Sequence, residues 1–163
     1  MTTEAEMVAL LKKRYSGASS AGLPRYITAS QVPIFIAGDH RRIDFIAVDS
    51  MREEVILPPD TAYTRLPPPV HGFEVKVSRA DWLTEHRTAG KKSEPWRGRC
   101  HDWWLVVPNQ NVIKPEELPS GWGLLVGEKQ LRAVVKPARS FITEPLDMGL
   151  LRTIARYSQR NKQ

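Results

Sequence analysis

Apolar and charged residues alternate from Phe73 to Val77, with Glu74 and Lys76 at the charged positions. A period of two residues is that of a β-strand with one buried face. Such a strand turns its apolar side chains toward a core and places Glu74 and Lys76 together on the other face, about 6.6 Å apart along the strand. Taken alone, this pair is equally consistent with a surface ion pair and with a catalytic pair.

A second predicted strand, Ile43 to Val48, is apolar at every position except Asp44. A nearly continuous apolar run is typical of a strand that is covered on both faces. An ionised aspartate in such a strand is costly when it has no partner. A metal ion would remove that cost, so Asp44 is a candidate ligand.

The other elements follow from caps, turns and periodicity. The connection from Asp49 to Val70 carries five prolines and has no clear period. The pattern predicts a helix from about Thr3 to Tyr15, two short strands from Arg25 to Ile36 that turn back into the Asp44 strand, a helix from Ser78 to about Arg87, a second helix from Ser93 to near Cys100, a strand from Trp103 to Pro108 that runs parallel to the Glu74 strand, a hairpin over Gly121 to Pro137, and a basic amphipathic helix at about 146–160.

Glu4 lies within the apolar stripe of the first predicted helix, whereas Glu6 lies outside it. A glutamate in the first turn is favoured by the helix dipole, and this is one reading of Glu4. The other reading is that Glu4 points toward the site of Asp44.

Length and composition indicate one domain over residues 1–163, because 41% hydrophobic residues can form a substantial core. The single cysteine, Cys100, excludes an internal disulfide framework and a cysteine-based zinc site. No apolar run approaches the roughly 18 residues of a membrane span. The start of the chain lacks a basic region followed by an apolar one. We therefore expect a protein that is neither exported nor embedded in a membrane.

The net charge of +6 and the pI near 9.7 favour a polyanionic partner. Basic residues flank the two motif strands, and basic flanks around an acidic centre suit DNA held by its phosphates. The candidates for DNA binding are Arg41, Arg42, Lys91, Lys92, Arg97 and Arg99. A solvated basic surface is the alternative for each of them.

Asp44, followed about thirty residues later by Glu74-x-Lys76, resembles the motif of the PD-(D/E)XK nuclease superfamily. The segments HRRIDFIAV and HGFEVKVSRADWL are similar to strands of archaeal Holliday-junction resolvases and of MmcB-like DNA repair proteins. CHDWWLVVP and LPSGWGLLV resemble later strands of small nuclease-like proteins from actinobacterial phages. Ile43 stands where the superfamily's name has proline, a position without a ligand. The resemblance implies an α/β fold with a restriction-endonuclease-like core, a central mixed β-sheet flanked by helices.

The resemblance also implies a metal-dependent DNA nuclease, an endonuclease that hydrolyses phosphodiester bonds in phage or bacterial repair, recombination or genome processing. Asp44, Glu74, Lys76 and Glu4 would be catalytic. The ligands would be Asp44, Glu74, the backbone carbonyl of Val75, and Glu4, whose role rests on a similar N-terminal helix in the archaeal resolvases. Such hard oxygen donors suit one or two Mg²⁺ or Mn²⁺ ions. Resolvases cut as dimers, which implies a homodimer, and the expected location is the cytoplasm of a bacterial cell or phage-infected host.

Two further assignments accompany this prediction. Lys92 matches a basic residue of the phage proteins that would contact a phosphate, and Asp102 could orient a metal-bound water. Two other classes of function stay open: a DNA-binding module of nuclease fold without catalysis, and a structural or partner-binding protein in which Asp44, Glu74 and Lys76 form an ion network.

Overall fold

The computed structural model describes residues 1–36, 38–50, 55–56, 64–65, 69–88, 91, 93–140, 142, 144 and 147–160. A six-stranded mixed sheet lies at its centre, in the order β1-β2-β5-β6-β7-β8. The strands are β1 (Tyr26–Ile36), β2 (Asp39–Asp49), β5 (Val70–Val75), β6 (Asp102–Val107), β7 (Gly123–Val126) and β8 (Arg132–Val135). β5, β6 and β7 are parallel, and the other neighbouring strands are antiparallel.

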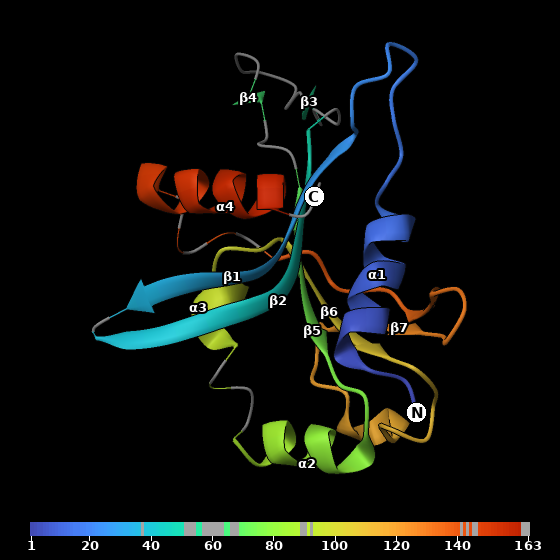
Figure 1. Ribbon diagram of the computed structural model, residues 1–163. Helices are drawn as coiled ribbons and strands as arrows, with labels where there is room; N and C mark the ends of the chain where they lie inside the picture. The colour runs from blue at the N-terminus through green and yellow to red at the C-terminus, as the bar shows by residue number, and fades with distance from the viewer. Residues whose placement is uncertain are drawn as a thin grey trace.

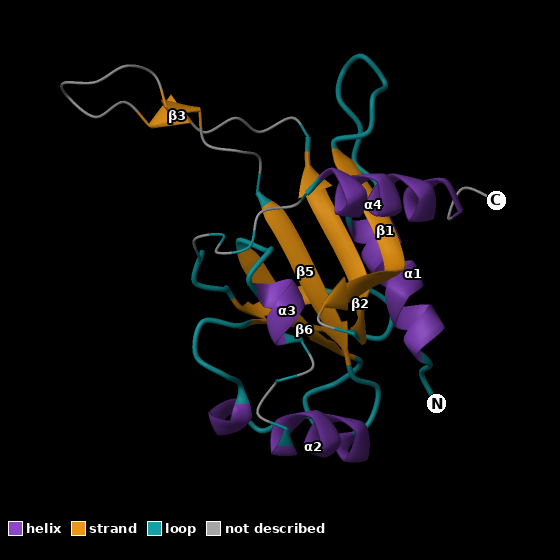
Figure 2. Ribbon diagram, turned by 90° about the vertical axis from the view of Figure 1, so that its left-hand side faces the viewer, coloured by secondary structure: helices purple, strands orange, loops and turns teal. Residues whose placement is uncertain are grey.

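Helices cover both faces of this sheet (Figures 1 and 2). They are α1 (Glu4–Arg14), α2 (Arg79–Arg87), α3 (Glu94–Arg97) and α4 (Met148–Arg160), with a 3-10 helix, η1, at Pro115–Glu117. The α/β class and the mixed sheet flanked by helices are therefore confirmed. Among the described residues, no helix combines the length and apolar character that crossing a membrane requires.

The two faces of the sheet have separate apolar cores. On one face, α1 packs Met7 and Leu11 against Phe45 and Phe73. On the other face, Trp82 of α2, Trp96 of α3 and Ile154 of α4 belong to a core that includes Ile46 and Leu105. All six residues of β6 are buried, because this strand is central and covered on both faces.

Local sequence sets the starts of the two helices nearest the site. Thr3 and Glu6 form a capping box at α1: the Thr3 hydroxyl accepts from the Glu6 N–H at 3.2 Å, and Glu6 accepts from the Thr3 N–H at 2.7 Å. Glu4 is thus left without a part in the cap. At α2, the Ser78 hydroxyl accepts from the Asp81 N–H at 3.2 Å, as the predicted cap requires.

Three predicted elements differ in extent. The two short strands before the Asp44 strand are the single strand β1, because it pairs with β2 along nearly its whole length. The helix expected from Ser93 to near Cys100 has only four residues, Glu94–Arg97. Much of the proline-rich connection lies outside the described residues, and within it β3 (Val55–Ile56) pairs with β4 (Thr64–Arg65).

Candidate functional site

The β1–β2 ladder is interrupted at Gln31 and Asp44. Ser30 pairs with Phe45 and Val32 with Ile43, but Gln31 and Asp44 between them do not form a ladder pair. Gln31 has a φ of 56°, the only positive value at a non-glycine residue in the described part of the chain. Such a backbone conformation is costly for a residue with a side chain, and strained residues of this kind cluster at functional sites.

The interruption also breaks the alternation of side chains along β2. Ile43 and Ile46 belong to the same apolar core, although strict alternation would send residues three apart to opposite faces. Beyond this point the β1–β2 hairpin bends away from the main sheet, and Figure 1 shows it projecting to the left. Asp44 therefore lies where the pleat changes sides, which keeps its carboxylate out of both cores.

Strands β2 and β5 also separate at Asp44. Phe45 and Phe73 are the last paired residues of this ladder. At the next position of β2, a side chain and not the backbone contacts β5. Asp44 Oδ2 accepts a hydrogen bond from the Val75 N–H at 2.8 Å. On its other side β5 remains paired with β6, and the Lys76 N–H donates to the Val106 carbonyl at 3.0 Å. Asp44 thus occupies the opening between the diverging strands, beside the backbone of Val75.

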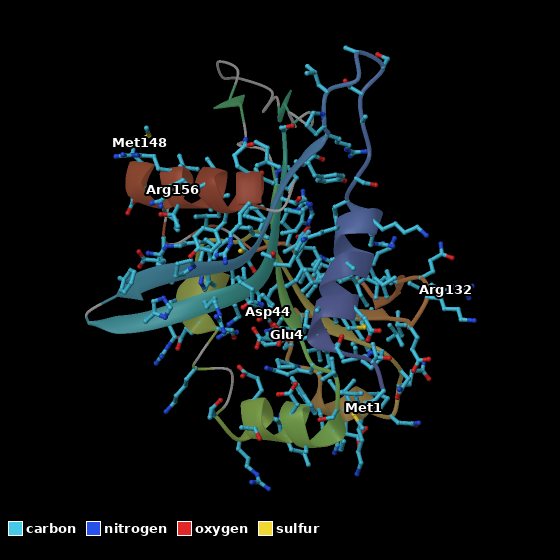
Figure 3. All side chains as sticks on the ribbon, viewed as in Figure 1. Met1, Glu4, Asp44, Arg132, Met148 and Arg156 are labelled. Atoms are coloured by element: carbon cyan, nitrogen blue, oxygen red, sulfur yellow. The ribbon has the colours of Figure 1, made fainter. Side chains whose placement is uncertain are left out.

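Gln31 connects Glu4 to Asp44. Its Nε2 donates to Glu4 Oε1 at 2.7 Å and lies 3.5 Å from Asp44 Oδ1. Figure 3 shows Glu4, at the start of α1, close to Asp44. Glu4 reaches the site through the side-chain amide of Gln31. The sequence reasoning missed Gln31, because no periodic signal marks this residue.

Glu74 and Lys76 form a close ion pair. Lys76 Nζ lies 2.8 Å from Glu74 Oε1, and both side chains are about seven-eighths buried. Two further carboxylates surround the ammonium, with Glu85 Oε2 at 3.7 Å and Asp81 Oδ1 at 3.9 Å. Both come from α2, which follows the motif directly. Their spacing of four residues was the available signal, because residues at i and i+4 share one face of a helix.

Burial perturbs the two carboxylates of the motif. It raises the pKa of Asp44 to about 6, and the charge of Glu4 adds to this effect while the hydrogen bond from Val75 opposes it. Burial likewise raises the pKa of Glu74 to about 8, with repulsion from Asp44 as the second cause and Lys76 as the main opposing one. Burial alone would lower the pKa of Lys76, but Glu74 and the α2 carboxylates outweigh it and raise the pKa.

The donor chemistry fits a hard divalent cation, although the carboxylates do not converge on one point. Among the described residues, no group of three or more His, Cys, Asp or Glu side chains is arranged to hold a metal ion. The nearest set of oxygen donors consists of Asp44 and Glu74, with the backbone of Val75 next to both. A divalent cation would favour the ionised form of both carboxylates and offset the burial that raises their pKa values.

The predicted DNA-binding residues have different surroundings. Arg42 and Lys91 are exposed, Arg41 is partly exposed, and Lys92 lies outside the described residues. The guanidinium of Arg97 lies over the Trp122 ring, 5.5 Å from its centroid. Arg99 donates to the Pro95 carbonyl at 2.6 Å. Arg97 and Arg99 therefore already have contacts within the protein.

Asp102 is wrongly placed for the metal-linked role that the sequence suggested. It pairs with His71, three steps from Glu74 along the β5–β6 ladder. Its carboxylate accepts two hydrogen bonds from Arg139, at 3.2 and 3.0 Å, and lies 3.0 Å from His71 Nδ1. Burial would raise the pKa of Asp102, but these partners lower it to about 2. Asp102 is thus the centre of an ion network at the other end of the strands.

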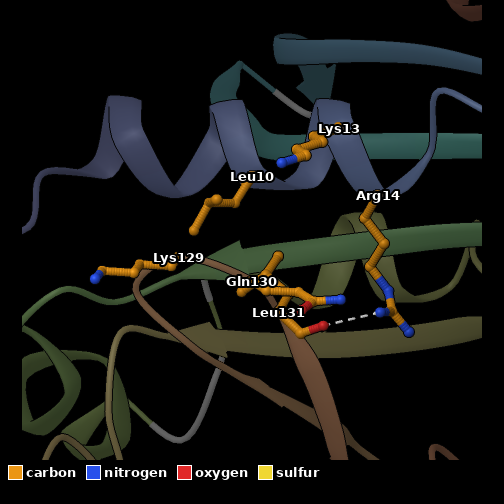
Figure 4. A pocket seen from close by; sticks show the side chains of 6 residues that line it. All are labelled: Leu10, Lys13, Arg14, Lys129, Gln130 and Leu131. Atoms are coloured by element: carbon orange, nitrogen blue, oxygen red, sulfur yellow. Dashed lines mark hydrogen bonds between the residues drawn. The ribbon is translucent and has the colours of Figure 1, made fainter.

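A basic cavity lies apart from the motif, between α1 and the turn that joins β7 to β8 (Figure 4). Its volume is about 550 Å³. It is lined by Leu10, Lys13, Arg14, Lys129, Gln130 and Leu131. Arg14 donates to the Leu131 carbonyl at 3.0 Å, so one of its three cations has a partner within the protein. None of the predicted catalytic residues lines this cavity.

Comparison with known proteins supports the fold and no more. No protein-family model and no curated protein matches the chain. Among solved structures, the SPO1766 protein of unknown function from Silicibacter pomeroyi is similar, with a TM-score of 0.59 and 18% sequence identity. The match covers 98% of this chain and 86% of that one. At this identity the likeness shows a shared fold.

Proposed function

We propose that this protein is a metal-dependent DNA nuclease of the PD-(D/E)XK type, which hydrolyses phosphodiester bonds as an endonuclease. The observation that carries the proposal is that Asp44 accepts a hydrogen bond from Val75, the residue between Glu74 and Lys76, where β2 and β5 diverge. An aspartate from one strand and a Glu-x-Lys from its neighbour are brought within contact of the same backbone segment. The proposed cofactor is Mg²⁺ or Mn²⁺, as one or two ions.

Asp44 and Glu74 would hold the ion, with the Val75 carbonyl as a third donor and Glu4 acting through Gln31. When bound, Mg²⁺ or Mn²⁺ would lower the pKa of a water molecule and offset charge on the phosphoryl oxygens. The chain's own contribution is to gather two carboxylates in a buried position where the pKa values of both are raised. Two such groups stay ionised together most easily when a cation lies between them.

Lys76 would act as a fixed positive charge. Three carboxylates hold its ammonium group and raise its pKa, so it keeps its proton at neutral pH. A preorganised cation stabilises the negative charge that builds on the phosphoryl group during hydrolysis. Glu85 and Asp81 are positioning residues in this scheme, since they contact Lys76 and not the substrate.

The wider proposals follow from charge and from the resemblance. A net charge of +6 suits a polyanion such as DNA. A role in phage or bacterial DNA repair, recombination or genome processing, a cytoplasmic location and a homodimer are proposed with the nuclease activity.

Within the described part of the chain, no three His, Cys, Asp or Glu side chains are arranged to hold a metal ion, and this favours a second candidate, a DNA-binding module of nuclease fold that does not cut. In that case the fold and the basic surface would serve binding alone. The ion pairs of Lys76 would then only stabilise the fold.

A cleavage assay separates the two candidates. Wild type and the Asp44→Asn variant are incubated with Mg²⁺, Mn²⁺ or a chelator on supercoiled plasmid, single strands and a four-way junction. The nuclease proposal expects cutting that requires metal and is lost in the variant. Salt-sensitive binding without cutting of any of these substrates would reject it in favour of the binding module.

A further inference from the structure

A groove of about 350 Å³ lies beside the candidate site, between the β1–β2 hairpin and the end of α4. The residues that matter for its chemistry are Gln31, Pro33, His40, Arg42, Tyr157 and Arg160. Gln31 is also the residue that bonds Glu4 and lies against Asp44. The groove therefore reaches the residue that contacts Asp44, the carboxylate that would hold the metal ion.

The hairpin presents a cation to the groove, and an exposed aromatic ring lies further out, beside His40 of the groove lining. Pro33 pairs with Arg42, and Phe35 pairs with His40, so the side chains of each pair lie on the same side of the hairpin. Along the hairpin from Gln31 toward its tip, Arg42 comes first and the Phe35–His40 pair follows. The hairpin thus extends the site by two steps of the ladder.

Phe35 is unusually exposed for its size. Its relative exposure is 77%, and its ring lies 4.8 Å from that of His40, centroid to centroid. Phe35 belongs to neither apolar core of the protein. A large apolar ring that is held on a strand and turned to solvent offers one face for stacking.

The charge of the groove is positive. Arg42 comes from β2 and Arg160 from the last turn of α4, where its guanidinium lies 5.9 Å from the centroid of the Tyr157 ring. Among the described residues that line the groove, none carries a carboxylate. Cations next to an exposed aromatic ring are the combination that binds single-stranded nucleic acids, in which phosphates meet the cations and bases stack on the rings.

We infer that this groove binds an unpaired strand next to the bond that is cut, so that the preferred substrate is DNA with a single-stranded segment. This inference rests on the proposed nuclease function. Arg42 and Arg160 contact the phosphates, and one base stacks on Phe35. A volume of about 350 Å³ is at the small end of ligand sites and has no room for a duplex. A base inside a duplex has no free face for Phe35, because its neighbours already cover it.

Binding measurements in chelator test the inference without any cleavage. Fluorescence anisotropy is recorded with a labelled single strand and with a duplex of the same sequence, for wild type, Phe35→Ala and Arg42→Ala. We expect each variant to bind the single strand roughly tenfold more weakly, the loss for about one stacked base or phosphate contact. The affinity for duplex should change less than about twofold.

Matched controls come from the opposite edge of the sheet. Val134 of β8 is an exposed apolar residue, and Arg132 of the same strand is exposed and lies far from the hairpin in Figure 3. Val134→Ala and Arg132→Ala should bind both oligonucleotides as wild type does. Thermal unfolding of all four variants checks that the fold is retained.

The inference is overturned if Phe35→Ala and Arg42→Ala bind the single strand as tightly as wild type, if both oligonucleotides are weakened equally, or if wild type binds no single strand. A parallel cleavage assay with Mn²⁺ separates this from the proposed function. If wild type cuts DNA and the variants bind and cut as wild type does, the inference about the groove is rejected and the nuclease proposal stands. If the variants lose single-strand binding and wild type does not cut, the groove is a binding site for single strands and the nuclease proposal is rejected.

Discussion

Replacing Asp44 with asparagine should make the folded protein more stable at alkaline pH when no metal is present. The substitution keeps the shape of the side chain, and the asparagine oxygen can still accept from the Val75 N–H. It removes a negative charge that burial disfavours. A gain in stability from a change at the centre of a site is expected where function requires an unfavourable charge.

The magnitude follows from the pKa of Asp44, which rises from 3.8 to about 6 on folding. For an acid with a raised pKa, the folded state binds the proton more tightly than the unfolded state. The contribution of Asp44 to stability is therefore most favourable below pH 3.8 and is lost as the pH rises through about 6. The full difference corresponds to roughly 3 kcal/mol. Because the new amide must also rearrange its contact with Gln31, we expect a net gain of about 1–3 kcal/mol at pH 8.

Urea denaturation in chelator, followed by the fluorescence of the five tryptophans, measures this gain at pH 4.5, 6 and 8. The advantage of Asp44→Asn should be small at pH 4.5 and largest at pH 8. Glu128→Gln, which removes an exposed carboxylate in the β7–β8 turn, is the control and should change stability little at any pH.

Metal should reverse the order of the two proteins. Mn²⁺ at about 1,000 times its dissociation constant would stabilise wild type by about 4.1 kcal/mol, which exceeds the expected gain of Asp44→Asn, and should stabilise the variant much less. The reasoning is refuted if Asp44→Asn is less stable than wild type at pH 8, or if the difference between them does not depend on pH.

Three further predictions concern single residues. Lys76→Ala should abolish cleavage while DNA binding persists, because the fixed cation is lost; a variant that cuts at the wild-type rate would contradict the assigned role. Gln31→Gly should be roughly 1 kcal/mol more stable than Gln31→Ala in urea denaturation, since glycine adopts a positive φ without strain; equal stabilities would show that the backbone there is relaxed. Asp102→Asn should lower stability at neutral pH by roughly 2 kcal/mol, because it removes the anion that Arg139 and His71 share. This loss of stability should disappear as the pH falls through about 2. Cleavage by the folded variant should be unchanged, and a slower cleavage rate would show that Asp102 takes part in catalysis.

The sequence alone determined the parts of the site that depend on short-range periodicity. The alternation from Phe73 to Val77 predicted that Glu74 and Lys76 share a face, and their side chains meet at 2.8 Å. The helical stripe of α1 separated Glu4, which turns to the site, from Glu6, which belongs to the cap. The apolar run of β6 predicted its central, buried position.

Only the tertiary structure decided how these elements meet. The break at Gln31 and the separation of β2 from β5 leave no periodic mark in the chain. The four-residue spacing of Asp81 and Glu85 places them on one helix face but does not state that this face packs against Lys76. Asp102 was misjudged for the same reason, because a pattern within one strand does not state which end of the neighbouring strand it will face. Side-chain direction along a strand or helix is a local property of the backbone, and it repeats every 2 or 3.6 residues. Register, strand divergence and helix docking depend on packing between residues far apart in sequence, which no local pattern records.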